Sequence, residues 1–280
     1  MSTDAAGGTQ LAQLSAFPAN GRVTQVRVAR SEWRKLWSVR STRYSLLALI
    51  ALTIGIAAIA AAVVAARYPQ MSPRARANID PMKVTLAGVQ LGQLAIGVLG
   101  VLVITAEYST GMIRASLGAV PKRLPVLWAK AGVFGLVALV VSIPSVVIAF
   151  FLAQSLLSSH PQLHLAFGAP GVARAVIGAG LYLTVVGLMS VGIGTILRST
   201  AGAIATFVAL MFVIPPLMNI LPTSWNDTAS PYLPSNAGQA VMSLTHGANT
   251  LAPWTGFGVF CAWAAAALAI GAVVLIRRDA

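Results

Sequence analysis

The residues that could catalyse a reaction or bind a metal are few in this chain and widely separated. It has three histidines, one cysteine and six acidic residues among 280 positions. His160 and His164 are four residues apart, but Pro161 lies between them and no glutamate follows the first, so the helical zinc-protease pattern is absent. The Gly-Lys-Ser/Thr ending of a phosphate-binding loop occurs nowhere in the sequence. We therefore predict no catalytic site, no metal site and no nucleotide hydrolysis by this chain itself.

A group of uncharged polar residues lies near apolar stretches instead. Gln90 and Gln93 are three residues apart, and Gly97 shares their helical face, which makes the strongest polar stripe in the chain. Gly88 begins a Gly-x-x-x-Gly step, a pattern that favours close packing between membrane helices. Asn219 lies at the end of a later apolar stretch. We predict that Gly88, Gln90, Gln93 and Asn219 line a pathway or a dimer face, with ordinary helix packing as the alternative.

The elements that hold these residues must cross a membrane. Apolar residues make up 57% of the chain and charged residues 9%, whereas a soluble domain carries about 25% charged residues. So few charges cannot cover a water-facing surface, which excludes a soluble enzyme, and the apolar content excludes disorder. Six uncharged stretches are long enough to span a bilayer, and their uniform apolar character is not that of β-barrel strands. They are residues 45–66, 84–105, 131–156, 175–197, 201–221 and 254–276.

We therefore predict an all-α membrane protein with six transmembrane helices. Residues 21–280 form one membrane domain, and residues 1–20 form a disordered cytoplasmic tail. No acidic residue lies within the six stretches, which argues against an ion-coupled transporter. Residues 222–253 are long for a structureless loop, so we expect a partly re-entrant or interfacial cap there, with a short helix near 237–244.

The distribution of basic residues predicts the orientation. The net charge is +13, and the basic residues lie mostly between the apolar stretches, where they meet lipid headgroups, so nucleic acid is not expected as a partner. With the amino terminus inside, 14 Lys and Arg residues face the cytoplasm and 5 face the other side. Both termini are thus predicted to be cytoplasmic, although the first outer loop, at 67–83, holds four basic residues.

Two segments on the predicted cytoplasmic side carry a pattern. Before the first span, Val26, Ala29, Trp33, Leu36 and Trp37 recur at steps of three and four, with basic residues on the other face. This is typical of an amphipathic helix that lies in the membrane interface. After the second span, residues 107–123 begin with an acid and end with bases. A short helix there could dock into a partner's groove.

The second of these segments resembles part of a known family. Residues 106–130 contain Glu107-Tyr108, the run Gly111-Met112-Ile113-Arg114, then Leu117, Pro121-Lys122-Arg123 and Ala129-Lys130. This stretch is similar to the segment after the second span in permease subunits of ABC-2 type transporters. The six-span layout, the amphipathic amino-terminal helix and the capped loop before the last span also resemble that family, from about residue 26 onward.

The resemblance implies a half-transporter in the plasma membrane, usually an exporter. It would pair with a second permease copy or a homologous permease, and a separate cytoplasmic ATP-binding subunit would hold the ATP. The family's ATPase-coupling segment then falls here on Glu107, Gly111, Arg114 and Arg123. Two alternatives stay open. One is an ATPase-independent carrier or scaffold. The other is a membrane enzyme that uses His246 with Ser243 or Asp227.

Overall fold

The fold is helical throughout the part of the chain that the computed structural model describes. Those residues are 25–109, 123–218, 220, 222–245, 247 and 250–277, and every regular element in them is a helix. Six of the helices are long and apolar enough to cross a membrane. The predicted all-α architecture with six candidate spans is therefore confirmed, and the chain is a multi-pass membrane protein.

At most of their ends the spanning helices run beyond the uncharged stretches that predicted them, whereas the second span begins three residues later than predicted, at Ala87. Both α6 and α8 continue into charged residues, Glu107 and Lys130, which are buried and paired with each other. The spans are α3 (Arg40–Arg67), α6 (Ala87–Ser109), α8 (Arg123–Leu157), α9 (Val172–Leu197), α10 (Thr200–Val208) continued by η2 (Ala209–Val213) and α11 (Ile214–Met218), and α14 (Pro253–Arg277).

Short helices fill the connections. Ser72 and Asp80 each begin one, because a side-chain oxygen accepts hydrogen bonds from backbone amides of the first turn, and a proline follows at the first helical position. The short elements are α2 (Gln25–Ser38), η1 (Tyr68–Gln70), α4 (Pro73–Ala77), α5 (Pro81–Thr85), α12 (Thr223–Ala229), η3 (Ser230–Tyr232), α13 (Pro234–Gln239) and η4 (Ala240–Met242). The last two replace the single short helix expected near 237–244.

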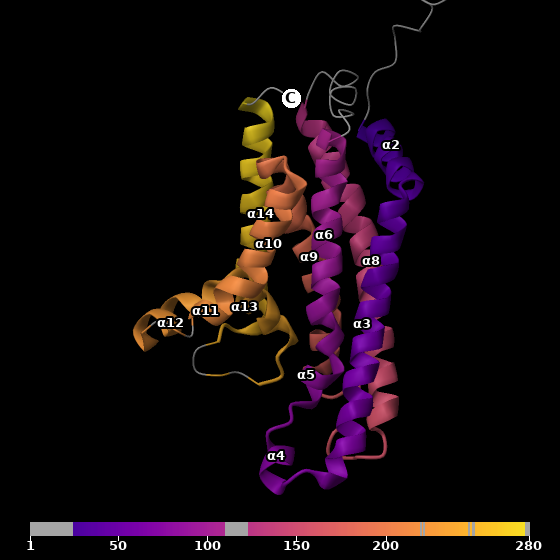
Figure 1. Cartoon of the computed structure of the whole chain (residues 1–280), viewed down its shortest axis with the longest axis vertical. Coiled ribbons are helices and arrows are strands. Elements are labelled where there is room, and N and C mark those ends of the chain that lie inside the picture. Colours follow the sequence, from indigo (N-terminus) through magenta and orange to yellow (C-terminus); the bar gives the residue numbers. More distant parts are fainter. Residues whose placement is uncertain are drawn as a thin grey trace, which may run out of the picture.

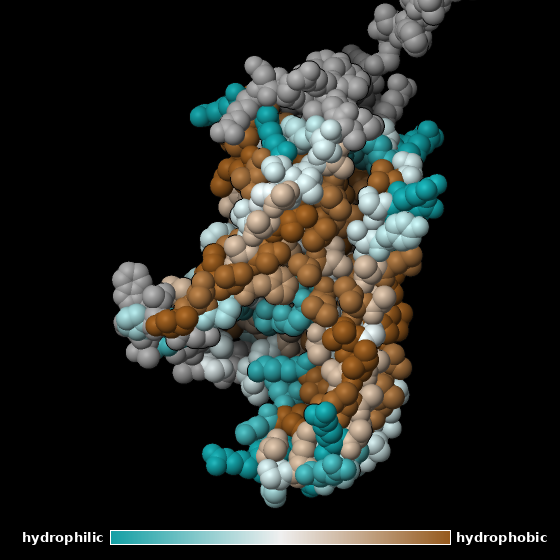
Figure 2. Space-filling view, viewed as in Figure 1, coloured by the Kyte–Doolittle hydropathy of each residue, from teal (hydrophilic) through white to brown (hydrophobic). Residues whose placement is uncertain are grey.

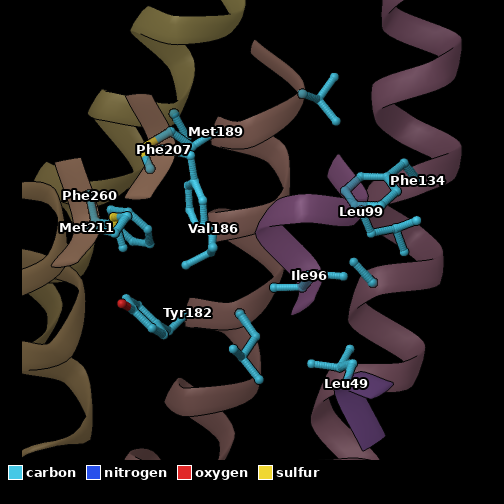
Figure 3. Packing of buried hydrophobic residues seen from close by; sticks show 14 of the residues in the cluster. Leu49, Ile96, Leu99, Phe134, Tyr182, Val186, Met189, Phe207, Met211 and Phe260 are labelled. Carbon is cyan, nitrogen blue, oxygen red and sulfur yellow. The ribbon is translucent and has the colours of Figure 1, made fainter. Parts of the chain in front are cut away.

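Helix α9 is the centre of the bundle. It contacts α6, α8, α10 and α14, and 18 of its 26 residues are buried. Its glycines allow this closeness: a Cβ at Gly192 would lie 2.6 Å from the backbone carbonyl carbon of Ala267 in α14. The glycines of the stretch 187–194 thus serve helix packing. Figure 3 shows large apolar side chains from several helices, among them Phe134, Phe207 and Phe260, meeting in the core around α9.

The outer surface has the distribution that a bilayer requires. Figure 2 shows a hydrophobic band along the middle of the long helices and hydrophilic residues at both ends. In Figure 1, α2 and the end of α14 lie at one end of the molecule, and α4 and α5 lie at the other. The first and last described helices are therefore on the same side. We call this side the α2 end and the other the α5 end.

The fifth span differs from the rest. Its middle turn, η2, is a π-helix in which the Ile214 amide bonds to the Ala209 carbonyl, and two prolines, Pro215 and Pro216, follow at once. Prolines have no amide hydrogen, so the carbonyls four residues before them lose their α-helical partners. The helix bends there, as two consecutive prolines in a sequence predict. Figure 1 shows α11 and α12 extending sideways from the bundle. Only 17% of this span's most apolar window is buried.

Candidate functional site

Four charged side chains from three helices meet at the α2 end. The Lys130 ammonium of α8 donates to Glu32 Oε2 of α2 at 2.5 Å and to Glu107 Oε1 of α6 at 2.8 Å. The Lys35 ammonium of α2 donates to Glu32 Oε1 at 2.7 Å and to the same Glu107 oxygen at 3.1 Å. We call Glu32, Lys35, Glu107 and Lys130 the charged cluster. Its two acids and two bases make it neutral as a unit.

The cluster is largely removed from water. Glu32, Lys130 and Glu107 are 3%, 4% and 8% exposed, and only Lys35 reaches the surface. Burial alone would raise the pKa of the Glu32 carboxyl, but the Lys130 and Lys35 ammonium groups more than offset this and hold that pKa below its ordinary value of 4.5. Burial would lower the pKa of Lys35, whereas Glu32 and Glu107 raise it above its ordinary 10.5. All four groups are therefore mutually dependent, since a buried charge without its partner is strongly unfavourable.

The local structure of α2 explains how Glu32 and Lys35 reach the charged cluster. Glu32 and Leu36 are four residues apart and both buried, so they share the face of α2 that packs on α8. Trp33 and Trp37 lie on an adjacent face, with rings 5.9 Å apart, and both are nearly half exposed. The helix ends before Val39, whose backbone is extended, and α3 then begins in a new direction. A bent pair of helices thus places one face of α2 against the bundle and leaves its tryptophans outward.

Glu107 lies inside the second span rather than at the start of a separate short helix. It belongs to the last turns of α6, and its second carboxylate oxygen is buried without a hydrogen-bond partner among the described residues. Gly111 and Arg114 lie outside the described residues, and Arg123 is the first residue of α8, with only its backbone described. The structure therefore gives Glu107 two partners, Lys35 and Lys130, that the sequence did not indicate.

What the cluster can do is mechanical. It joins α2 to the end of α6 and to the beginning of α8, and residues 110–122 connect these same two helices. The cluster therefore ties both ends of that connection to α2. Because three of the four groups are buried, the ties are short and tightly constrained, unlike the weak ion pairs of an exposed surface.

A second set of polar side chains lies near the α5 end and carries no charge. The Tyr182 hydroxyl of α9 donates to Gln93 Oε1 of α6, and the Gln93 amide donates to Gln90 Oε1 at 3.0 Å. The Gln239 side chain of α13 lies against that hydroxyl. We call Gln90, Gln93, Tyr182 and Gln239 the neutral polar chain. Figure 3 shows Tyr182 beside Phe260 of α14, with a ring separation of 5.2 Å.

The other two residues of the predicted pathway or dimer face have different surroundings. A Cβ at Gly88 would lie 1.9 Å from the backbone oxygen of Thr53 in α3, so the Gly88 backbone packs directly on a neighbouring helix of the same chain. This supports helix packing as the role of Gly88. Asn219 lies outside the described residues. Gln90 and Gln93, by contrast, are joined to each other as their spacing predicted.

Residues that sequence reasoning missed include Glu32, Tyr182 and Gln239. Glu32 could have been found, because it is one of only six acids and shares a helical face with Leu36. Tyr182 and Gln239 come from separate parts of the chain, and no local pattern connects them with Gln93. The enzyme alternative proposed roles for Ser243 and Asp227. The Ser243 hydroxyl donates to the Thr245 carbonyl at 2.6 Å.

Comparison with known proteins adds no identification. No model of a known protein family matches the chain, and no curated protein matches it.

Proposed function

We propose that this chain is the membrane-spanning permease subunit of an ATP-binding cassette transporter of the ABC-2 type, working as an exporter. Three features support this: six candidate spans, the resemblance of residues 106–130, and a sequence without a phosphate-binding loop. A separate ATPase subunit would supply the energy, and two permease copies would enclose the substrate pathway.

The charged cluster is the observation that carries the proposal. A transporter driven from outside its membrane domain needs a rigid connection between the surface that the ATPase touches and the helices that move. The cluster supplies buried ion pairs at the two ends of the resembling segment, with Glu107 near its beginning and Lys130 at its end. In this proposal the ATPase docks on residues 107–123, and the cluster transmits the displacement to α6, α8 and α2 together.

The proposal also fixes an orientation. The α2 end faces the cytoplasm, α2 lies in the inner interface of the plasma membrane, and the α5 end faces outward, in line with the 14-to-5 distribution of basic residues. Cysteine introduced at Ser230 should react with an impermeant thiol reagent in intact cells, and cysteine at Ser116 should not. The opposite labelling would reverse the orientation.

Co-purification tests the function directly. The tagged chain, extracted with mild detergent, should bring down a phosphate-binding-loop ATPase in stoichiometric amount. In this proposal Arg114 faces an acidic group of the ATPase. Arg114→Glu would put two negative charges opposite each other, and should reduce the recovered ATPase by at least about tenfold. Arg114 is preferred to Glu107 as the test, because removing Glu107 also leaves Lys130 and Lys35 poorly paired and lowers stability.

The matched control is Arg74→Glu, the same reversal on an exposed arginine of α4 at the α5 end. Equal recovery of the ATPase with both variants would contradict docking at the resembling segment. Wild-type chain that carries no ATPase would contradict the permease assignment and favour an independent carrier or a scaffold.

A further inference from the structure

A cavity of about 590 Å³ opens at the α5 end, in the size range that holds a drug-sized molecule. Residues 80–90, from α5 and the start of α6, form one wall, and residues of η3, α13 and η4 form the other, together with Thr250 and Leu251. Figure 2 shows a hollow on this face with hydrophilic side chains inside it. None of the proposed coupling residues lines the cavity, so it is separate from the charged cluster.

The described lining is neutral. Its one acid and one base, Asp80 and Lys83, are 4.0 Å apart, and Asp80 already accepts the first amides of α5. The remaining polar groups are amides and hydroxyls, and apolar side chains such as Met82, Leu86 and Met242 lie among them. The described lining has no net charge, so it offers a charged ligand little in return for lost hydration and favours an uncharged ligand with apolar parts.

Two amides of the lining have their hydrogen bonding fixed by the neutral polar chain. Gln90 accepts from Gln93 through its oxygen, which leaves the Gln90 –NH₂ group to donate. The Gln239 side chain lies against the Tyr182 hydroxyl and also lines the cavity, where its amide oxygen can accept a hydrogen bond. Tyr182 is 1% exposed and is held by the core, so it orients both ends of the chain.

We propose that this cavity binds a neutral, peptide-like ligand, whose carbonyl accepts from Gln90 and whose amide donates to Gln239. A trans peptide group points its carbonyl oxygen and its N–H in opposite directions, and Gln90 and Gln239 lie on opposite walls of the cavity. Apolar side chains of the ligand would contact Met82, Leu86 and Met242. None of the described lining residues is aromatic, so the cavity lacks the flat surface on which a sugar ring would stack.

The site belongs to one chain and needs no ATPase, so its test is independent of the proposed function. The full chain in lipid nanodiscs should bind the blocked tripeptide N-acetyl-Leu-Ala-Leu-amide, measured by calorimetry against empty nanodiscs. Heat equal to that of empty nanodiscs would overturn the proposal. So would binding of maltotriose, a neutral sugar of similar size, in place of the peptide.

Gln90→Glu tests the donor end. The substituted carboxylate still accepts from Gln93 but turns the outward donor into an acceptor, and the peptide should bind about tenfold more weakly. Gln70→Glu is the matched control, because Gln70 is exposed in η1 and outside the lining, and its affinity should stay within about twofold of wild type. An equal affinity loss in both variants would overturn the proposal.

A change in the ligand tests the acceptor end and does not depend on how any variant folds. Methylation of the central amide nitrogen removes the hydrogen that Gln239 would accept, and affinity for the wild-type chain should fall about tenfold. Undiminished binding of the methylated peptide would show that the peptide lies elsewhere or is held only by its apolar groups, and would overturn the assignment.

Discussion

The two ends of the bundle solve the problem of burying polar groups in different ways. At the α2 end, four ionised groups from α2, α6 and α8 neutralise one another within hydrogen-bonding distance. At the α5 end, buried amides and hydroxyls satisfy one another by hydrogen bonds between uncharged groups, as in the neutral polar chain. Gln154 is a second example, because it donates to Thr85 at 3.0 Å and accepts from the Leu165 amide at 2.8 Å. Both ends join helices that are far apart in sequence.

The difference lies in what happens when one member is lost. An unpaired buried charge is far more unfavourable than an unpaired buried amide, so the charged cluster holds together or fails as a unit. A neutral chain can lose or exchange one hydrogen bond at a smaller penalty, which suits a wall that is proposed to bind a ligand. The strong, exclusive ties thus lie where force is proposed to enter, and the exchangeable ones lie beside the cavity.

The largest expected effect comes from breaking the charged end. Lys130→Met leaves Glu32 and Glu107 with only Lys35 between them, and should lower the free energy of unfolding by about 3–5 kcal/mol. Thermal unfolding in nanodiscs measures the loss. Lys83→Met, at a side chain that is 84% exposed, is the control and should change stability by less than about 0.5 kcal/mol.

A second substitution sharpens that test. Adding Glu32→Gln to Lys130→Met restores one acid to one base, so the double variant should be more stable than Lys130→Met alone. If the double variant is instead the less stable, charge balance is not what holds this end together.

A smaller effect is expected at the neutral end. Tyr182→Phe removes the hydroxyl and leaves buried Gln93 Oε1 without its donor, which should lower the free energy of unfolding by about 1–3 kcal/mol. Tyr44→Phe, at a residue 69% exposed, serves as the matched control. Thermal unfolding that shows the same change for both tyrosines would mean that the neutral polar chain adds nothing to stability.

The smallest effect is the dependence on pH, which only the charged end should show. The lowered pKa of Glu32 gives stability that is complete above 4.5 and is lost as the pH falls through the folded-state value. The raised pKa of Lys35 gives stability that is complete below 10.5 and is lost as the pH rises further. Between these limits the contribution should be level. At acidic pH, Glu32→Gln should reduce the change of unfolding temperature with pH, and Tyr182→Phe should not. Equal pH dependence in the two variants would contradict an origin in Glu32.

The sequence predicted the helices well and their polar contacts poorly. Uniform apolar stretches located all six spans, and the period of Trp33, Leu36 and Trp37 located α2, because both are local properties of the chain. The spacing of Gln90 and Gln93 likewise predicted a shared face, and the two side chains are hydrogen-bonded.

Contacts between distant segments were not predictable in this way. Glu32 and Lys130 are 98 positions apart, and each alone reads as a charge at the edge of the membrane. Their pairing follows from how α2 bends at Val39 and packs on α8, which is a property of the assembled fold. In the sequence, Tyr182 looks like one more apolar residue of α9. Only the assembled fold places Gln93 and Gln239 beside its hydroxyl.

The bent fifth span has a consequence for the surrounding lipid. Thr200–Met218 is 19 residues long, which as a straight helix would reach about 28 Å, whereas the 35 residues of α8 would reach about 52 Å. A hydrocarbon core is about 30 Å thick, and the bend shortens the reach of α10 and α11 further. We expect the bilayer to thin beside this span, or flanking side chains to reach the headgroups, to accommodate its length. This mismatch makes the chain's stability depend on bilayer thickness, which thermal unfolding in lipids of increasing acyl-chain length would measure.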